Sequence, residues 1–369
     1  MTNITPCNTP TSIEDAIDGA LKSSGKINVI IAGKTGVGKS TLINTVFRGN
    51  LAQTGSGRPV TQGTEEISKQ GHPVTIIDTK GLELKDYGTI AAELADVIDT
   101  RSLSEDENQH IHVAWLCIHE DGRRVEDAEI ELCRLFADKN IPVVVVITKS
   151  RSDNGFSDEV RQTLPSAAAI VSVRAMAEEL DDDGESINLK PKGLDKLILE
   201  TNRLLPEAKK RAYANALSSR HLAATRLKIE QAEKEVIFAA TAAGAIAAVP
   251  IPFSDAVGLV PVQVGMLAKI GITFGMEIST TALTTLVTST LGAGAATLIG
   301  RTLVTGLLKM IPGAGSVVGG TIAAATASAL TKALGAAYIA VLTRFIEQNP
   351  DKELDMTLIT AELKKRISP

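Results

Sequence analysis

Eight residues near the N-terminus have the types and spacing that bind a phosphate group. Residues 33–40 lie between an apolar run over 27–31 and an amphipathic run over 41–47. Glycines at this spacing let backbone N–H groups turn inward as a concave nest at the positive end of a helix. The pattern predicts a P-loop for a nucleoside triphosphate. Its predicted residues are Gly33, Lys34, Thr35, Gly36, Val37, Gly38, Lys39, Ser40 and Thr41.

Two of these side chains would act directly on the nucleotide. Lys39 would place a positive charge beside the β- and γ-phosphates, and the Ser40 hydroxyl would be a Mg²⁺ ligand. A second element, Asp78-Thr79-Lys80-Gly81, follows an apolar run over 73–77. In a D-x-x-G element the Asp holds Mg²⁺ through water and the Gly N–H senses the γ-phosphate, which gives these roles to Asp78 and Gly81.

The polar, Gly-rich loop over 55–64 lies between these two motifs. A threonine in it could complete the Mg²⁺ shell and order the loop only when the γ-phosphate is present. Thr61 and Thr64 both qualify, and the spacing to Asp78 favours Thr61. Lys39, Thr61 and Gly81 are thus the predicted catalytic residues, and Ser40, Thr61 and Asp78 the predicted metal ligands.

The elements that must position these residues alternate along the first 205 residues. Apolar strands are predicted over 27–31, 73–77, 111–118, 141–147 and 169–173, with charged helical segments between them. This order predicts a doubly wound, mostly parallel α/β sheet. Trp115 is expected in the core, and the histidines at 110, 112 and 119 lack a carboxylate or Cys at metal-ligand spacing.

The P-loop, the D-T-K-G-L element and the strand-end dipeptide Thr148-Lys149 resemble the translation-factor-related GTPases. The resemblance covers about residues 25–205 and is nearest to the Era/TrmE-like, septin-like and AIG-type branches. It implies GTP and GDP as ligands together with Mg²⁺. It also implies that guanine is read by the strand-end [NT]-K-x-D motif and by a later S-A element.

Both base-reading elements depart from the family pattern. Arg151 replaces the base-reading Asp, and Asp153, two residues later, would need a bulged loop to reach the guanine. The S-A element reads Arg174-Ala175, whose backbone could meet the base although its side chain cannot copy the serine. The base-side candidates are therefore Thr148, Lys149, Asp153, Arg174 and Ala175, and guanine is favoured by the family rather than by this motif.

Two further departures concern hydrolysis. Leu82 follows Gly81 where Ras-like proteins carry a water-orienting Gln, so intrinsic hydrolysis should be slow. Gly36 stands where potassium-activated relatives carry Asn, so potassium stimulation is not expected. Lys34 or Arg58 could act across a homodimer formed through the nucleotide face, as the septin-like resemblance suggests.

Composition narrows the partners and the compartment. The net charge of −5 gives no basic field for nucleic acid, so no nucleic-acid partner is expected. Three cysteines without a C-x-x-C pair favour a reducing cytosol, and residues 1–6 show no signal-peptide pattern. We expect a cytoplasmic protein or one held peripherally at the inner face of the membrane.

The chain changes character after about residue 205. We expect an N-terminal segment with a short helix over 1–24, a GTPase domain over 25–205 and a helical connector over 206–235. Residues 236–369 would form an all-α, Ala/Gly-rich domain. This last part resembles the helical domain of unknown function that follows Era-like GTPase domains in many bacterial proteins. The resemblance rests on the turn over 249–255 and the run over 262–266.

Three uncharged stretches, 236–254, 278–300 and 311–331, approach the ~20 residues that span a hydrocarbon core. They are rich in Ala, Gly and Thr and lack an aromatic belt, and Pro250, Pro252 and Pro261 interrupt the first. Reversible membrane association, a soluble helical bundle and constitutive spans all remain open. We expect Asp255 and Gln263 to make local capping contacts rather than to form a functional site.

Three functions fit these patterns. The leading one is a slowly GTP-hydrolysing switch whose helical domain engages a membrane or a partner protein. The second is a nucleotide-loaded scaffold with negligible turnover, which Leu82 would suit. The third is an effector that permeabilises membranes under nucleotide control. Measured turnover separates the first two, and liposome binding separates the third.

Overall fold

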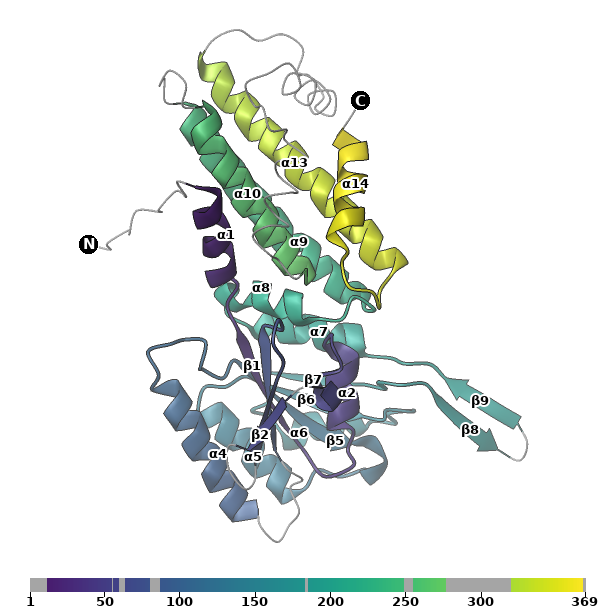
Figure 1. Cartoon of the computed structure of the whole chain (residues 1–369). Coiled ribbons are helices and arrows are strands. Elements are labelled where there is room, and N and C mark those ends of the chain that lie inside the picture. Colours follow the sequence, from purple (N-terminus) through teal and green to yellow (C-terminus); the bar gives the residue numbers. More distant parts are fainter. Residues whose placement is uncertain are drawn as a thin grey trace. The chain divides into compact units, whose positions relative to one another are not determined.

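The computed structural model describes residues 12–54, 56–59, 64–79, 87–182, 185–248, 255–276 and 320–367. The chain divides into two compact units. One unit holds residues 25–224, and the other combines residues 1–24 with residues 225–369. Figure 1 traces the chain through both. The division between the units falls inside the predicted connector over 206–235.

The first unit is built on a seven-stranded sheet with the order β2-β3-β4-β1-β5-β6-β7. The central strands are β1 (Ile27–Ala32), β4 (Val74–Thr79), β5 (Val113–His119), β6 (Val143–Thr148) and β7 (Ala169–Ser172). These five are parallel, and their apolar, β-branched residues are buried on both faces, as parallel strands require. The predicted fold class and the predicted central strands are confirmed.

Two antiparallel strands at the sheet edge are not predicted by the sequence. β2 (Ser56–Pro59) pairs with β3 (Thr64–Ser68), which pairs with β4. The sequence predicts a loop over 55–64, but residues 56–59 of this segment form a strand. Their composition of Ser, Gly, Arg and Pro has little strand propensity, so the ladder to β3 is what makes them extended.

Helices cover both faces of this sheet. α4 (Tyr87–Ser102), α5 (Asp127–Asp138) and α6 (Phe156–Thr163) pack on one face through residues such as Leu94, Leu132 and Phe156. The other face carries α2 (Lys39–Val46), α7 (Leu194–Leu204) and α8 (Glu207–Ala216). There Trp115 is fully buried, stacks on Phe47 and donates a hydrogen bond to Thr201. Its predicted core position is confirmed. The short helix α3 (Leu51–Thr54) follows α2.

A separate two-stranded hairpin extends from this unit (Figure 1). It consists of β8 (Glu178–Asp182) and β9 (Glu185–Leu189), paired antiparallel between β7 and α7 in the chain. The acidic sequence of β8 predicts no strand, because Asp and Glu are depleted in strands. The hairpin begins directly after the Arg174-Ala175 element.

The second unit is helical. It contains α1 (Ile13–Lys22), α10 (Asp255–Phe274), α13 (Gly320–Gln348), α14 (Met356–Ile367) and most of α9 (Leu222–Ala247). Small residues allow close packing: Ala16 of α1 lies against Gly265, and a Cβ at Gly335 would meet Val236 at 2.4 Å. Gln263 donates a hydrogen bond to Thr331 at 3.2 Å, which joins α10 to α13.

Three expectations about this unit can be compared with the structure. Pro261 lies inside α10 and does not interrupt it, at the cost of one backbone hydrogen bond. Residues 325–348 of α13 are long and apolar enough to cross a membrane, but half of the apolar window is buried within the structure, as in the core helix of a soluble protein. The stretch over 278–300 and residues 249–254 lie outside the described residues.

Candidate functional site

The phosphate loop joins the end of β1 to the start of α2, as its sequence predicts. Gly33, Gly36 and Gly38 have φ values of +148°, +76° and +105°, which only glycine adopts easily. At Gly33 space is also limiting, because a Cβ would lie 2.5 Å from the backbone oxygen of Cys117. The loop therefore keeps its concave shape because side chains are absent where the backbone turns. Ser40 and Thr41 follow in the first turn of α2.

The Lys39 side chain folds back over its own loop. Its ammonium donates to the carbonyl oxygens of Gly33 at 2.8 Å and Lys34 at 3.3 Å. The side chain is only 10% exposed, so these oxygens compensate for part of its lost hydration. The charge thus stays beside the backbone nest that would hold phosphate oxygens.

Asp78 lies near Lys39 because β4 is the parallel neighbour of β1. The two charged groups are 4.0 Å apart, and Oδ1 of Asp78 is buried without a hydrogen-bond partner among the described atoms. Burial raises the pKa of Asp78 from 3.8 to about 6, with Lys39 lowering it and Glu65 raising it further. The carboxylate is therefore placed where a cation would stabilise its charged form.

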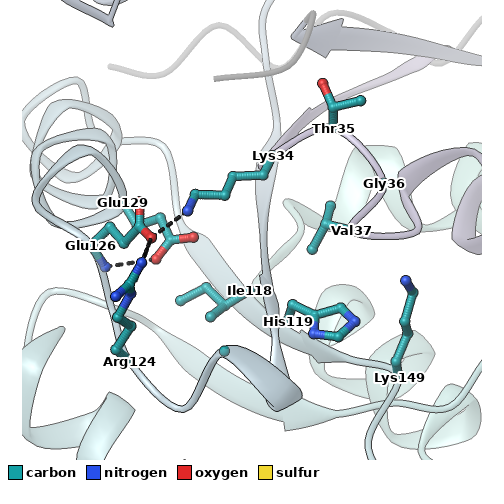
Figure 2. A pocket seen from close by; sticks show the side chains of 11 residues that line it. Lys34, Thr35, Gly36, Val37, Ile118, His119, Arg124, Glu126, Glu129 and Lys149 are labelled. Atoms are coloured by element: carbon teal, nitrogen blue, oxygen red, sulfur yellow. Dashed lines mark hydrogen bonds and ion pairs between the residues drawn. The ribbon is translucent and has the colours of Figure 1, made fainter. Parts of the chain in front are cut away.

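A cavity of about 360 Å³ adjoins the loop on the side of α5. Figure 2 shows Lys34 reaching toward Glu126 and Glu129, with Arg124 beside them. Lys34 and Arg124 both form ion pairs with Glu126, whose pKa falls below its usual range mainly through its hydrogen bond with Lys34. Val37, His119 and Lys149 line another part of the cavity. Glu126 also accepts a backbone bond in the capping box of α5, which holds this wall in place.

The loop after β6 contains the predicted base-side residues Thr148 and Lys149. Thr148 is buried and donates a hydrogen bond to the Ile118 carbonyl. Lys149 follows with φ at +51°, the left-handed region. Beyond Ser150, the backbone N–H groups of Arg151, Ser152 and Asp153 all donate at 3.0 Å to one oxygen of Glu120. This buried glutamate therefore shapes the whole loop.

Asp153 accepts local hydrogen bonds at the start of α6. Its carboxylate accepts from the backbone N–H and the hydroxyl of Ser157, which caps the first turn of α6. Arg151 turns away from it and pairs with Glu178 and with Asp121. If the loop bulged so that Asp153 could reach a base, these capping hydrogen bonds would break.

Arg174 is buried and structural. Its backbone N–H and carbonyl pair with Lys192, and its guanidinium donates to the carbonyls of Ser150 and Lys190. Both backbone groups of Arg174 are thus engaged within the protein, and a contact of the Arg174-Ala175 backbone with the base stays a prediction. Ala175 follows at the root of the hairpin, half-buried.

The remaining predicted residues divide by whether the structure describes them. Thr61, Gly81 and Leu82 lie outside the described residues. Thr64 is buried at the start of β3, opposite Thr79. Arg58 lies in β2. Glu120, Glu126 and Glu178 were missed by sequence reasoning, and only the position of Glu120 directly after an apolar strand could have drawn attention to it.

Comparison with known proteins agrees with this arrangement. Residues 28–149 match the family described as 50S ribosome-binding GTPase, and residues 213–366 match a domain of unknown function, DUF697. The probable GTP-binding protein EngB of Mycoplasmoides gallisepticum is 30% identical over 141 residues, which cover 38% of this chain and 69% of that protein.

Other relatives share shorter parts of their length. Septin-14 of Mus musculus is 24% identical over 157 residues, and GTPase Der of Campylobacter curvus is 31% identical over 128 residues. These matches cover 37% and 33% of this chain but only 36% and 25% of those proteins. A solved structure of Era from Aquifex aeolicus bound to GDP·AlF4⁻ covers 57% of this chain and 67% of its own, with 20% identity and a TM-score of 0.31.

The matched residues 28–149 include the phosphate loop and β4, and the match to EngB spans more than two thirds of that relative. The chain belongs to the P-loop GTPase family, in a form that continues into a DUF697 helical domain.

Proposed function

We propose that this protein is a guanine-nucleotide switch that binds GTP and GDP with Mg²⁺ and hydrolyses GTP slowly. The observation that carries the proposal is the pair formed by Lys39 and Asp78, 4.0 Å apart at the ends of β1 and β4. A cation over the backbone nest and a carboxylate with one oxygen lacking a hydrogen-bond partner among the described atoms are complementary to a metal–triphosphate complex.

Phosphate binding would replace contacts that the loop now makes with itself. The Lys39 ammonium would exchange the carbonyls of Gly33 and Lys34 for phosphate oxygens, which are charged and form stronger hydrogen bonds. The three positive-φ glycines leave the loop N–H groups free to turn toward the same oxygens.

The residues present also fit Mg²⁺. Oδ1 of Asp78 is buried without a partner among the described atoms, and Ser40 is exposed in the first turn of α2. Mg²⁺ would supply charge compensation between the β- and γ-phosphates. Asp78 would hold it through water and Ser40 directly, because hard cations of this size prefer oxygen ligands and retain several waters.

The switch itself would involve loops 54–67 and 80–88. Thr61 is proposed to complete the metal shell and Gly81 to sense the γ-phosphate, so that these loops order with GTP and relax after hydrolysis. Thr64 is the weaker alternative, because it is buried in the β3 ladder. Leu82 cannot orient water, which supports slow turnover or assistance from a second protein copy across the nucleotide face.

The helical unit would carry the output at a membrane or on a partner protein in the cytoplasm. The specific observation in favour of a membrane is α13, whose residues 325–348 are long enough to cross a membrane and have a mean hydropathy of 1.4. Because half of that window is buried within the structure, association would be conditional on the helices separating.

Nucleotide competition on the purified full chain tests the proposal. GTP should displace a fluorescent GTP analogue far better than ATP does, and Lys39→Ala should lower the affinity for GTP about 100-fold, which is about 2.7 kcal/mol. Lys69→Ala is the matched control, because in the described structure this half-buried lysine donates to the Gly49 carbonyl, outside the phosphate loop. Equal loss in both variants, or equal displacement by ATP, would contradict the proposal.

Turnover and membrane binding need separate measurements. Hydrolysis above the buffer background that disappears in Lys39→Ala supports the switch, and background turnover supports the scaffold alternative. Flotation of the full chain with anionic liposomes, with GDP or with a non-hydrolysable GTP analogue, tests the output. Flotation that changes with the nucleotide supports conditional association, and no flotation in either state leaves a protein partner as the output.

A further inference from the structure

The position at which the family reads guanine holds a pair of opposite charges rather than a lone carboxylate. Arg151 occupies this position, and its Nε lies 3.1 Å and 3.2 Å from the two carboxylate oxygens of Glu178. A terminal nitrogen of the guanidinium also contacts Glu178. Glu178 is the first residue of β8, three residues after Ala175, so it comes from the second base-side element.

The loop that carries Arg151 is held on several sides. Glu120 accepts three successive backbone N–H groups of the loop, and Arg174 donates to the Ser150 carbonyl at 3.0 Å. Lys192 donates to the Arg151 carbonyl at 2.9 Å. Such a loop changes conformation little on binding, so the orientation of Arg151 toward Glu178 is set before a ligand arrives.

Guanine presents two donors, N1–H and the exocyclic amine, on the edge that a carboxylate recognises. An arginine alone at this place would set donors against donors. Four carboxylates contact this region in the described structure. Asp153 is occupied with Ser157, and Glu120 is 3% exposed, with one oxygen held by three backbone N–H groups and the other buried away from a ligand. Asp121 is exposed and 3.5 Å from a single guanidinium nitrogen.

Glu178 differs from these three. Its side chain is 30% exposed, both of its oxygens are oriented by one guanidinium, and Lys149 and Arg174 are close enough to act on its charge. Hydrogen bonding to Arg151 lowers the pKa of Glu178, so the group is an anion at neutral pH. Each oxygen retains acceptor capacity beyond the bond to Arg151.

We propose that Glu178, held in place by Arg151, is the carboxylate that reads N1–H and the exocyclic amine of guanine. This inference rests on the proposed function and identifies its specificity-determining residue. Arg151 then acts as a positioning residue, and the hairpin of β8 and β9 delivers the group that the strand-end motif has lost.

The test exploits the hydrogen-bond pattern of the base. Xanthine carries N1–H beside a carbonyl, so an amide, which offers one acceptor and one donor, matches xanthine where a carboxylate matches guanine. In Glu178→Gln the affinity for GTP should fall about 30-fold while the affinity for xanthosine triphosphate rises, reversing the preference of the wild type. Competition binding of both nucleotides to the full chain, with Mg²⁺, measures this.

Two controls separate base reading from a structural effect. Glu179→Gln makes the same change on the next residue of β8, whose side chain points to the other face of the hairpin, and should leave the preference for GTP intact. The exchange Arg151→Asp/Glu178→Arg places a carboxylate on the strand-end loop and keeps the ion pair, so it should retain guanine preference.

The outcomes are distinguishable. Unchanged GTP preference in Glu178→Gln, or an equal fall for both nucleotides without a gain for xanthosine triphosphate, overturns the role of Glu178. If the same change of preference appears in Asp121→Asn instead, the reader is Asp121 and the inference is wrong. If the wild type binds no triphosphate in a Lys39-dependent way, the proposed function itself fails.

Discussion

Two partly buried carboxylates at the two ends of the nucleotide site behave in opposite ways. Asp78, at the phosphate end, has one oxygen without a hydrogen-bond partner among the described atoms, and burial raises its pKa to about 6. Glu120, at the base end, is also desolvated, but hydrogen bonds from the loop over 150–153 outweigh this effect and lower its pKa. The pKa of the same functional group is thus raised at one end and lowered at the other, although Oε2 of Glu120 also lacks a hydrogen-bond partner among the described atoms.

The difference shows how the work of the site is divided. At the phosphate end Lys39 compensates the charge of Asp78 only in part, which costs stability and favours binding of a further cation. At the base end the charged side chains interact within the protein: Glu120 accepts hydrogen bonds from the loop, and Arg151 forms an ion pair with Glu178. The shift at the phosphate end thus favours binding of a cation, whereas the loop at the base end is held by hydrogen bonds within the protein.

The largest effect is expected where the ligand completes the site. Asp78→Asn should lower the affinity for Mg²⁺·GTP about 100-fold, about 2.7 kcal/mol, because the neutral amide cannot compensate the metal charge. Isothermal titration with Mg²⁺ and with EDTA measures the loss, which should vanish without the metal.

Asp99→Asn is the matched control for this prediction. Asp99 lies on α4 and pairs with Lys139 at 2.6 Å, and nothing relates it to the nucleotide. Equal affinities of Asp78→Asn and the wild type in Mg²⁺ would show that Asp78 is an ordinary buried carboxyl, and the contrast with Glu120 would lose its functional meaning.

The second effect is on the stability of the nucleotide-free protein. The unfolded chain releases the Asp78 proton near pH 3.8 and the folded chain near pH 6, so the folded state binds more protons between these values. Asp78 therefore reduces stability as pH rises through this window, by about 2 kcal/mol after allowance for its partial exposure.

Denaturant unfolding of the wild type and Asp78→Asn at pH 4, 5, 6 and 7.5, in EDTA, measures this effect. The variant should be the more stable protein at pH 7.5, and its advantage should shrink toward pH 4. A variant that is less stable than the wild type at pH 7.5 would mean that the Asp78 carboxylate is already compensated.

The smallest of the three effects has the opposite sign. Glu120→Gln keeps the size and one acceptor oxygen but removes the charge that three N–H groups share, so the free energy of unfolding should fall by about 1.5 kcal/mol at pH 7.5. The preference for GTP over other triphosphates should weaken with it. Chemical unfolding and competition binding check the two parts. A stabilised Glu120→Gln variant would remove the contrast between the two ends.

Much of the phosphate end could be predicted because its chemistry is local. The glycine spacing dictates the backbone turns, and the parallel pairing of β1 with β4 places Asp78 beside Lys39 once both follow buried strands. The buried position of Trp115 in the core follows from its place in an apolar strand.

The base end could not be predicted in the same way. Glu120 and Glu178 are 31 and 27 residues from Arg151 along the chain, and nothing in their neighbourhood marks them as its partners. The hairpin of β8 and β9 has an acidic sequence that disfavours a strand, and the strand at 56–59 forms through its neighbour β3. The association of α1 with the helical unit also depends on packing, at Gly265 against Ala16, rather than on sequence order.

The amino-acid sequence by itself determined that this chain has a P-loop, a parallel α/β sheet and an apolar helical part, because glycine spacing and apolar periodicity act over a few residues. Only the tertiary structure decided the direction in which the pKa of each carboxyl group shifts. That property depends on the groups that distant segments bring to each carboxylate: three N–H donors to one oxygen of Glu120, and for Asp78 a lysine 4.0 Å away. Ionisation and affinity in a folded protein follow from such contacts, which no local pattern encodes.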